Sequence, residues 1–286
     1  MKCISPIEIK NKHDGGSMVV PCGRCVVCKD QRKKQWFIRI MAEVAYCDFT
    51  KFFTLTYSNE FLPNPEAPRL KHEDFQRFFK RLRKELKGIR LKYYMCGEYG
   101  EELGRPHYHC ILMIYGDLGE ININKVIRDK WPEGHVDIGS VTPRSVMYCL
   151  NYMDKLYLLE AKNPHEVKPY QKMSLGLGDT YFNANKDNLG SKGYITYEGV
   201  RYDIPRYAKD KYVEEIKEKI RLIPTDKAYA RKKELEMREQ LDSTYFKDIT
   251  DEEKLNVLLK KRAMYARSVQ VLKNIERRKE LRKKRK

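Results

Sequence analysis

The order of the predicted elements indicates an α+β fold, an antiparallel sheet with helices on one face, followed by a helical C-terminal extension. Three observations predict it. Segments with the twofold alternation of strands and segments with helical periodicity follow one another as strand, helix, strand, strand, strand, helix. Two of the strand segments are joined by a short turn-like sequence, which favours antiparallel pairing. The last part of the chain shows helical periodicity alone.

The first predicted element is a helix from Val26 to about Tyr46, where apolar residues recur at helical spacing. A strand follows at residues 51–57, KFFTLTY, which alternates and is rich in aromatic and β-branched residues. After a Pro-rich loop, the segment HEDFQRFFKRLRKELKG predicts an amphipathic helix with a basic exterior that ends at Gly88.

The remaining strands are predicted at residues 91–98, 107–115 and 134–141. Thr142 is a suitable helix cap and Pro143 a suitable first-turn residue, so the next helix is expected to begin there and to extend to about residue 159. Residues 162–199 are rich in Gly, Asn, Asp and Lys, and this composition predicts a long functional loop.

Charge and apolar content limit the class of protein. The 286 residues include 58 basic and 40 acidic side chains, which gives a formal net charge of +18. The longest apolar stretch near the middle, residues 110–115, is too short to span a bilayer, and the N-terminal sequence lacks the apolar region of a signal peptide. We therefore expect a soluble cytoplasmic protein. The positive charge predicts a nucleic-acid partner, and the alternative is a solubilising surface.

Three regions are expected along the chain. Residues 1–48 form a Cys-rich segment with the N-terminal helix, residues 49–207 form the α+β domain, and residues 208–286 form a basic helical tail. Residues 251–286 contain 14 basic and 5 acidic side chains, so half of the net charge lies there. This tail is either a solvated surface or a contact for the DNA backbone.

Two histidines predict a metal site. His107 and His109 form an H-x-H on a predicted strand, so both imidazoles point to the same face and can bind one ion. Glu98, on the strand across the short turn, can supply a third ligand. The alternative is that these histidines pack or hydrogen-bond within the sheet.

A second group lies on the helix that begins at Pro143. A rotation of 100° per residue places one set of side chains on a single face: Arg144, Tyr148, Asn151, Tyr152 and Lys155. Both tyrosines could simply pack. A phenol with a pKa of about 10 is a poor nucleophile at neutral pH, and it needs a nearby cation or a metal-polarised leaving group. Lys155 and the metal can provide these, and the two groups together predict tyrosine attack on a phosphodiester.

Eight cysteines in a cytosolic chain are expected to stay reduced. Cys22, Cys25 and Cys28 fall within PCGRCVVC, and with Cys3 they provide four thiolates, enough for a structural Zn²⁺. Simple burial is the alternative. The other four are interpreted as core residues: Cys47, Cys96, Cys110 and Cys149.

The segments FFTLTYS, GEYGEELGRPHYHCIL and VMYCLNYMDK resemble the three motifs of HUH-family rolling-circle replication initiators. The resemblance is closest to the replication-associated proteins of gokushovirus-type microviruses, which are single-stranded DNA bacteriophages, and it covers roughly residues 3–207. It implies an HUH endonuclease domain with an RRM-like fold at residues 49–207.

The resemblance also implies roles for single residues. The metal ligands for Mg²⁺ or Mn²⁺ would be His107, His109 and Glu98, the paired nucleophiles Tyr148 and Tyr152, and the helical base Lys155. Many relatives carry a lysine just before the second tyrosine, where this chain has Asn151. That difference leaves Lys155 as the helical base.

The implied activity is that of a metal-dependent, site-specific single-strand endonuclease and ligating enzyme that starts rolling-circle replication through a covalent 5′-phosphotyrosine. The implied partners are origin DNA, single-stranded and as the double-stranded replicative form, and a host helicase, in the cytoplasm of a bacterial host. The sequence contains no P-loop motif, so no nucleotide cofactor is expected. The alternatives are a plasmid initiator or transposase of the HUH type, or a noncatalytic zinc-containing DNA-binding protein.

Overall fold

The computed structural model describes residues 3–10, 15–64, 68–100, 104–155 and 167–222, without the side chains of residues 153–155 and 221–222. The chain divides into two compact units, residues 1–32 with 221–286, and residues 33–220. The division predicted from the sequence (1–48, 49–207 and 208–286) stays a prediction, and most of the basic tail lies outside the described residues. Within the described residues, no helix has the length and apolar character needed to cross a bilayer.

The larger unit is built on a five-stranded sheet in the order β6-β3-β5-β4-β7. The strands are β3 (Phe49–Tyr57), β4 (Arg90–Tyr99), β5 (Pro106–Tyr115), β6 (Gly134–Gly139) and β7 (Tyr170–Met173). Every neighbouring pair is antiparallel. The predicted class, α+β with an antiparallel sheet, is therefore confirmed.

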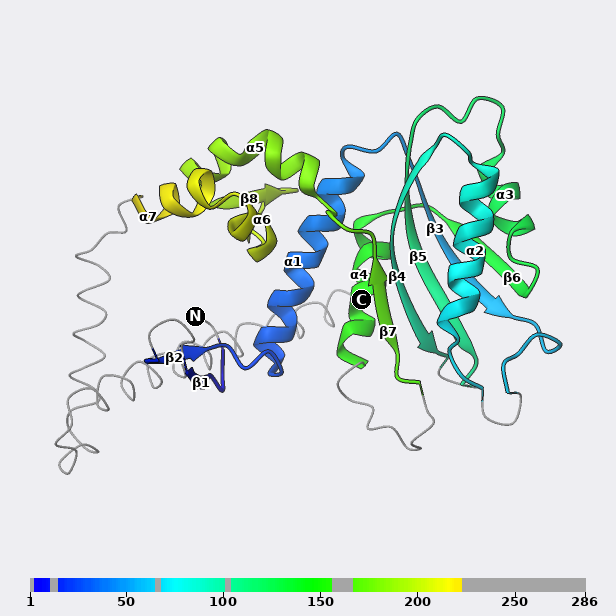
Figure 1. The fold of residues 1–286 in the computed structure, drawn as a ribbon, viewed down its shortest axis with the longest axis horizontal. Helices are drawn as coiled ribbons and strands as arrows, with labels where there is room; N and C mark the ends of the chain where they lie inside the picture. Colours follow the sequence, from blue (N-terminus) through cyan, green and yellow to red (C-terminus); the bar gives the residue numbers. More distant parts are fainter. Residues whose placement is uncertain (1–2, 11–14, 65–67, 101–103, 156–166, 223–286) are drawn as a thin grey trace, which may run out of the picture. The chain divides into compact units, whose positions relative to one another are not determined.

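Helices cover both faces of this sheet, not one face as expected (Figure 1). One face packs on α2 (His72–Glu85) and α3 (Ile123–Asp129), and the other on α4 (Pro143–Lys155) and the part of α1 (Val26–Val44) that belongs to this unit. The central strand explains the difference. Residues 110–114 of β5, CILMI, are apolar without interruption, and since successive side chains point to opposite faces, both faces need an apolar cover.

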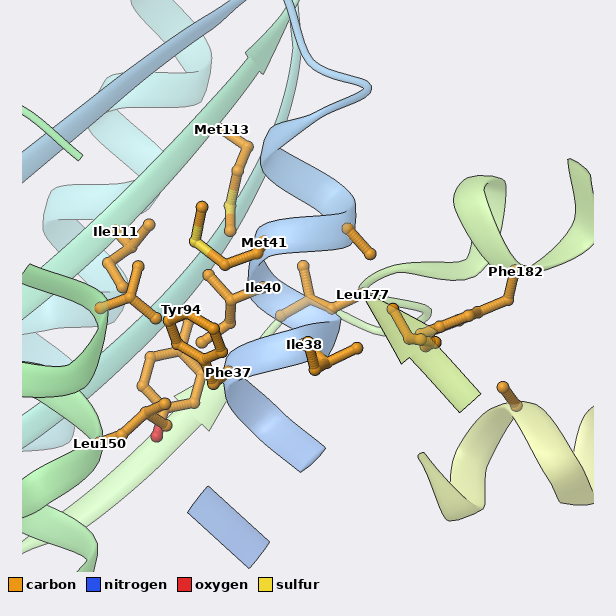
Figure 2. Packing of buried hydrophobic residues seen from close by; sticks show 14 of the residues in the cluster. Phe37, Ile38, Ile40, Met41, Tyr94, Ile111, Met113, Leu150, Leu177 and Phe182 are labelled. Atoms are coloured by element: carbon orange, nitrogen blue, oxygen red, sulfur yellow. The ribbon is translucent and has the colours of Figure 1, made fainter. Parts of the chain in front are cut away.

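The face under α1 and α4 forms a continuous apolar core. Figure 2 shows side chains of α1, β4, β5 and α4 packed together, among them Phe37, Ile40, Met41, Tyr94, Ile111, Met113 and Leu150. On α4, the residues Val146, Cys149 and Leu150 have no exposed surface. This buried stripe fixes the helix against the sheet, and the residues next to the stripe are thereby fixed as well.

The described part of the segment expected to be a long loop, residues 167–199, is ordered into regular elements. It contains β7, α5 (Asp179–Lys192) and β8 (Tyr194–Tyr197), which pairs with β9 (Val200–Asp203). The loop prediction failed because α5 has little amphipathic pattern: it buries only Phe182, Leu189 and Gly190. At Gly190 an added Cβ would meet the Glu215 carbonyl oxygen, so α5 approaches the following helical segment without room for a side chain.

The larger unit ends with three short helical segments, α6 (Arg206–Lys211), the π-helical η1 (Val213–Glu218) and α7 (Lys219–Leu222). In the smaller unit, β1 (Ile7–Lys10) and β2 (Ser17–Val20) form an antiparallel ribbon. The ribbon lies between Cys3 and the Cys-rich start of α1 in the sequence.

Candidate active site

Both predicted histidines lie on the face of the sheet that packs on α1 and α4. They are held by the neighbouring strand β3: the Thr54 hydroxyl oxygen is 2.9 Å from His109 Nδ1, and the Thr56 hydroxyl oxygen is 2.8 Å from His107 Nδ1. A histidine that binds metal through Nε2 keeps its proton on Nδ1 and donates it to an acceptor such as these hydroxyls. The strand register therefore orients both Nε2 atoms for a ligand.

Glu98 lies next to the same histidines. It is opposite His107 in the β4–β5 register, and its carboxylate oxygen Oε1 is 3.1 Å from His109 Nε2. Glu98 and His109 are each only 4% exposed. The three predicted ligands thus share one side of the sheet. Their ligand atoms are more widely spaced than those of a closed metal cluster, since within the described residues only the cysteine group gathers within 4.8 Å.

The surroundings of His107 suit a neutral metal ligand. Burial and the neighbouring His109 lower the pKa of His107, so its imidazole is uncharged at neutral pH. Gly100 lies directly against this ring, because a Cβ at position 100 would be 2.8 Å from His107 Nε2. A glycine at this position keeps the Nε2 side of the ring accessible.

The two tyrosines of α4 lie over His109. The ring of Tyr152 stacks on the imidazole with centroids 5.2 Å apart and an interplanar angle of 9°, and Tyr148 meets the same imidazole edge-on at 5.1 Å. The Tyr152 hydroxyl donates to the Tyr148 hydroxyl over 2.5 Å. Two phenolic oxygens thus meet beside the histidine and carboxylate group.

The two phenols differ in their environment. Tyr148 is 45% exposed, whereas Tyr152 is partly buried. Burial raises the pKa of both, and the hydrogen bond between them lowers the pKa of Tyr148 while it raises that of Tyr152. Both phenols are protonated at neutral pH in this environment, which agrees with the expectation that ionisation needs a nearby cation.

The remaining residues on the predicted helix face have varied positions. Arg144 is exposed, and the side chain of Lys155 lies outside the described residues. Asn151, at the position where relatives carry a lysine, accepts a hydrogen bond at 3.5 Å from Lys33 Nζ of α1. A lysine from another helix therefore lies next to the position that lacks one.

Sequence reasoning missed several contributors to this site. Thr54 and Thr56 carry a detectable signal, because their T-x-T spacing matches that of the H-x-H with which they pair. Lys33 and Gly100 carry none, since each reaches the site through tertiary packing or through the path of a loop. The four predicted cysteine ligands, Cys3, Cys22, Cys25 and Cys28, do gather, within the smaller unit.

Comparisons with known proteins agree with this arrangement. The sequence model of a family of replication-associated proteins of the ORF2 type matches residues 50–157, which span β3 to α4. Replication-associated protein VP4 of Bdellovibrio phage phiMH2K is 29% identical over 246 residues, covering 74% of this chain and 77% of the relative. Replication-associated protein ORF2 of Spiroplasma virus 4 is 30% identical over 268 residues, covering 85% of this chain and 84% of the relative.

Among solved structures, the N-terminal nuclease domain of minute virus of mice non-structural protein-1 matches 54% of this chain and 82% of that chain, with 12% identity and a TM-score of 0.20. A TM-score this low supports no inference about this chain.

Proposed function

This chain belongs to the family of viral replication-associated proteins, and we propose that it initiates rolling-circle replication by nicking one strand of origin DNA with a tyrosine. The observation that carries the proposal is the pair of tyrosines over His109. Their hydroxyls lie 2.5 Å apart, and both rings contact the same imidazole. A phosphate bound at this place could be attacked by either phenol.

In the proposed reaction, a tyrosine oxygen attacks the phosphorus of the scissile phosphodiester. The bond from phosphorus to the 3′ oxygen breaks, and that oxygen takes up a proton to become a free 3′ hydroxyl. The phenol loses its proton, and the 5′ phosphate stays esterified to the tyrosine. One phosphoester replaces another, so the ends can be rejoined without a nucleotide cofactor.

The residues present fit a divalent cation, Mg²⁺ or Mn²⁺. Two imidazoles with their Nδ1 atoms held by threonines, a buried carboxylate and a glycine against the ring of His107 leave ligand atoms available from His107, His109 and Glu98. Such an ion would polarise the phosphate and stabilise the charge that develops on it. The threonines orient the ligands, and α4 holds both nucleophiles in place.

A pair of nucleophiles suits a replication cycle. One tyrosine would keep the covalent 5′ end, and the second would cut the regenerated origin after one full circle. Tyr148, with nearly half of its surface exposed, is better placed for the first approach of DNA than Tyr152, which stacks on His109. The Lys33 ammonium next to Asn151, together with Lys155, would supply the cationic environment of the helix face.

The partners follow from this reaction. The chain would bind origin DNA as a single strand and as the double-stranded replicative form, with its positive charge on the phosphate backbone. A host helicase would unwind the nicked duplex in the bacterial cytoplasm. A plasmid initiator or transposase would use the same chemistry on another substrate, whereas a noncatalytic zinc-containing DNA-binding protein would form no covalent product.

The test is the formation of a protein–DNA adduct. The purified chain is incubated with Mn²⁺ and single-stranded oligonucleotides tiled over the circular genome that encodes it, and the products are separated on denaturing gels. Either single substitution, Tyr148→Phe or Tyr152→Phe, should keep some first cleavage, and the double substitution should keep none. The control Tyr46→Phe, at an exposed tyrosine outside the site, should react like the parent.

Circle completion separates the alternatives. It should fail in both single variants because it needs two nucleophiles in alternation. If Tyr148→Phe removes every adduct while Tyr152→Phe completes circles, the chain is a single-tyrosine enzyme, nearer to the plasmid or transposase alternative. Binding without any adduct in the parent protein would support the noncatalytic alternative.

A further inference from the structure

Four cysteines of the smaller unit form a compact cluster that the proposed reaction does not use. The sulfur atoms of Cys3, Cys22, Cys25 and Cys28 all lie within 4.8 Å of one another. Cys3 Sγ is 3.4 Å from Cys22 Sγ and 3.8 Å from Cys25 Sγ. In a tetrahedral site with zinc–sulfur bonds of about 2.3 Å, neighbouring sulfurs are about 3.8 Å apart. The cluster is therefore close to the size of such a site.

Backbone amides point at these sulfurs. The amides of Arg24 and Cys25 both donate to Cys22 Sγ at 3.4 Å, and the amide of Cys22 donates to Cys3 Sγ at 3.2 Å. The turn that places two amides on one sulfur includes Gly23 in the left-handed region, with φ of +72°. Amide donors of this kind orient thiolate ligands and favour their charged form.

The segment around the cluster has almost no core of its own. Of the described residues among the first 28, three are buried: Cys3, Val27 and Cys28. Both strands of the β1–β2 ribbon have four residues, and those of β1 are all exposed. An isolated two-stranded hairpin is marginally stable at best in water. This segment needs an additional source of stability, and two of its three buried residues are cluster cysteines.

We propose that Cys3, Cys22, Cys25 and Cys28 bind one structural Zn²⁺, which ties the start of the chain to the start of α1 and closes the ribbon between them. Four thiolates select zinc over the hard ions Mg²⁺ and Mn²⁺, and a site with four protein ligands has no open position for chemistry. Disulfides are the competing use of four thiols, but no described cysteine is in a disulfide.

The first measurement is metal content. The full-length chain, purified without chelator, should contain one zinc per chain by elemental analysis, and Co²⁺ substitution should give the visible absorption of a tetrahedral thiolate site. Cys25→Ser should lose the stoichiometric zinc, and the matched control Cys47→Ser, a half-buried cysteine outside the cluster, should keep it. If the parent lacks zinc and mass spectrometry finds disulfides among the four cysteines, the proposal is wrong.

A second variant separates this site from the catalytic one. His107→Ala combined with His109→Ala should keep both the zinc and the cobalt–thiolate spectrum. If zinc is lost in the histidine variant and kept in Cys25→Ser, the ion belongs to the histidine site and the cysteine proposal fails. A parent that forms no DNA adduct but keeps its zinc would refute only the proposed function.

The structural role has its own readout that does not depend on activity. Removal of zinc by a chelator should speed amide hydrogen exchange in β1 and β2 and leave exchange in β4 and β5 unchanged. Unchanged exchange in β1 and β2 after the metal has been removed would overturn the stabilising role.

Discussion

Replacement of Thr54 or Thr56 by valine keeps the shape of the side chain and removes the hydroxyl that contacts a histidine Nδ1. Loss of such a partner typically costs 10- to 100-fold in metal affinity, or about 1.4 to 2.8 kcal/mol. His109 is 4% exposed, so water cannot replace the missing hydroxyl, and we expect Thr54→Val to weaken metal binding about 100-fold. His107 is half-buried, so water can partly compensate, and Thr56→Val should cost about 10-fold.

The assay is the rate of oligonucleotide nicking as a function of Mn²⁺ concentration. The half-saturating concentration should rise by these factors, and the rate at saturating metal should be largely retained. Thr50→Val is the matched control, because Thr50 lies on the same strand and face but opposite Met113, away from the histidines. The reasoning is refuted if Thr54→Val leaves the half-saturating concentration unchanged and lowers only the maximal rate, or if Thr50→Val shifts it equally.

Four further predictions concern other parts of the chain. His107→Ala or His109→Ala should abolish nicking and leave DNA binding in gel shifts largely intact, and an equal loss of both would argue against a metal role. Gly100→Ala should raise the half-saturating Mn²⁺ concentration at least about tenfold without lowering the Tm, because its Cβ would crowd His107 Nε2, and an unchanged value would mean that the ring shifts freely. Although burial raises it, hydrogen bonds from Lys211, Tyr212 and Tyr207 hold the pKa of Asp179 below its ordinary value, so this carboxylate stabilises the fold above the unfolded pKa of about 4 and loses that effect as the pH falls through the folded pKa. Urea denaturation should therefore show Asp179→Asn to cost on the order of 1 kcal/mol at pH 7 and less near pH 3, and a pH-independent cost would contradict this. Deletion of residues 251–286 removes nine positive charges, so DNA affinity should fall and its salt dependence flatten, while chemistry on short oligonucleotides is retained; unchanged affinity would favour the solvated-surface interpretation.

The sheet and its histidine face were predictable because local pattern determines both. Alternation located the long strands, and the H-x-H spacing alone places two imidazoles on one face. The short connection between β4 and β5 also limits the register, so the position of Glu98 opposite His107 could be anticipated. The family read from three motifs is confirmed by the relatives that cover most of the chain.

What the sequence did not predict depends on contacts between distant segments. Lys33 reaches Asn151 across 118 positions of sequence, and no local pattern encodes such a contact. The α5 helix was missed because its buried side is small and its polar residues are typical of loops. The second helical layer was missed because an uninterrupted apolar strand indicates burial on both sides only when it is known to be central in the sheet.

The geometry of α4 explains why two tyrosines on one helix are not interchangeable. A separation of four residues rotates the second side chain by about 40° and moves it about 6 Å along the axis, so two phenols cannot present the same face to one imidazole. The structure has one ring parallel to His109 and the other nearly perpendicular to it. Val146, Cys149 and Leu150 are completely buried, which holds α4 fixed on the sheet. If the two tyrosines act in turn, the DNA ends must therefore exchange places at a stationary pair of nucleophiles, because rotation of the helix would expose its buried stripe.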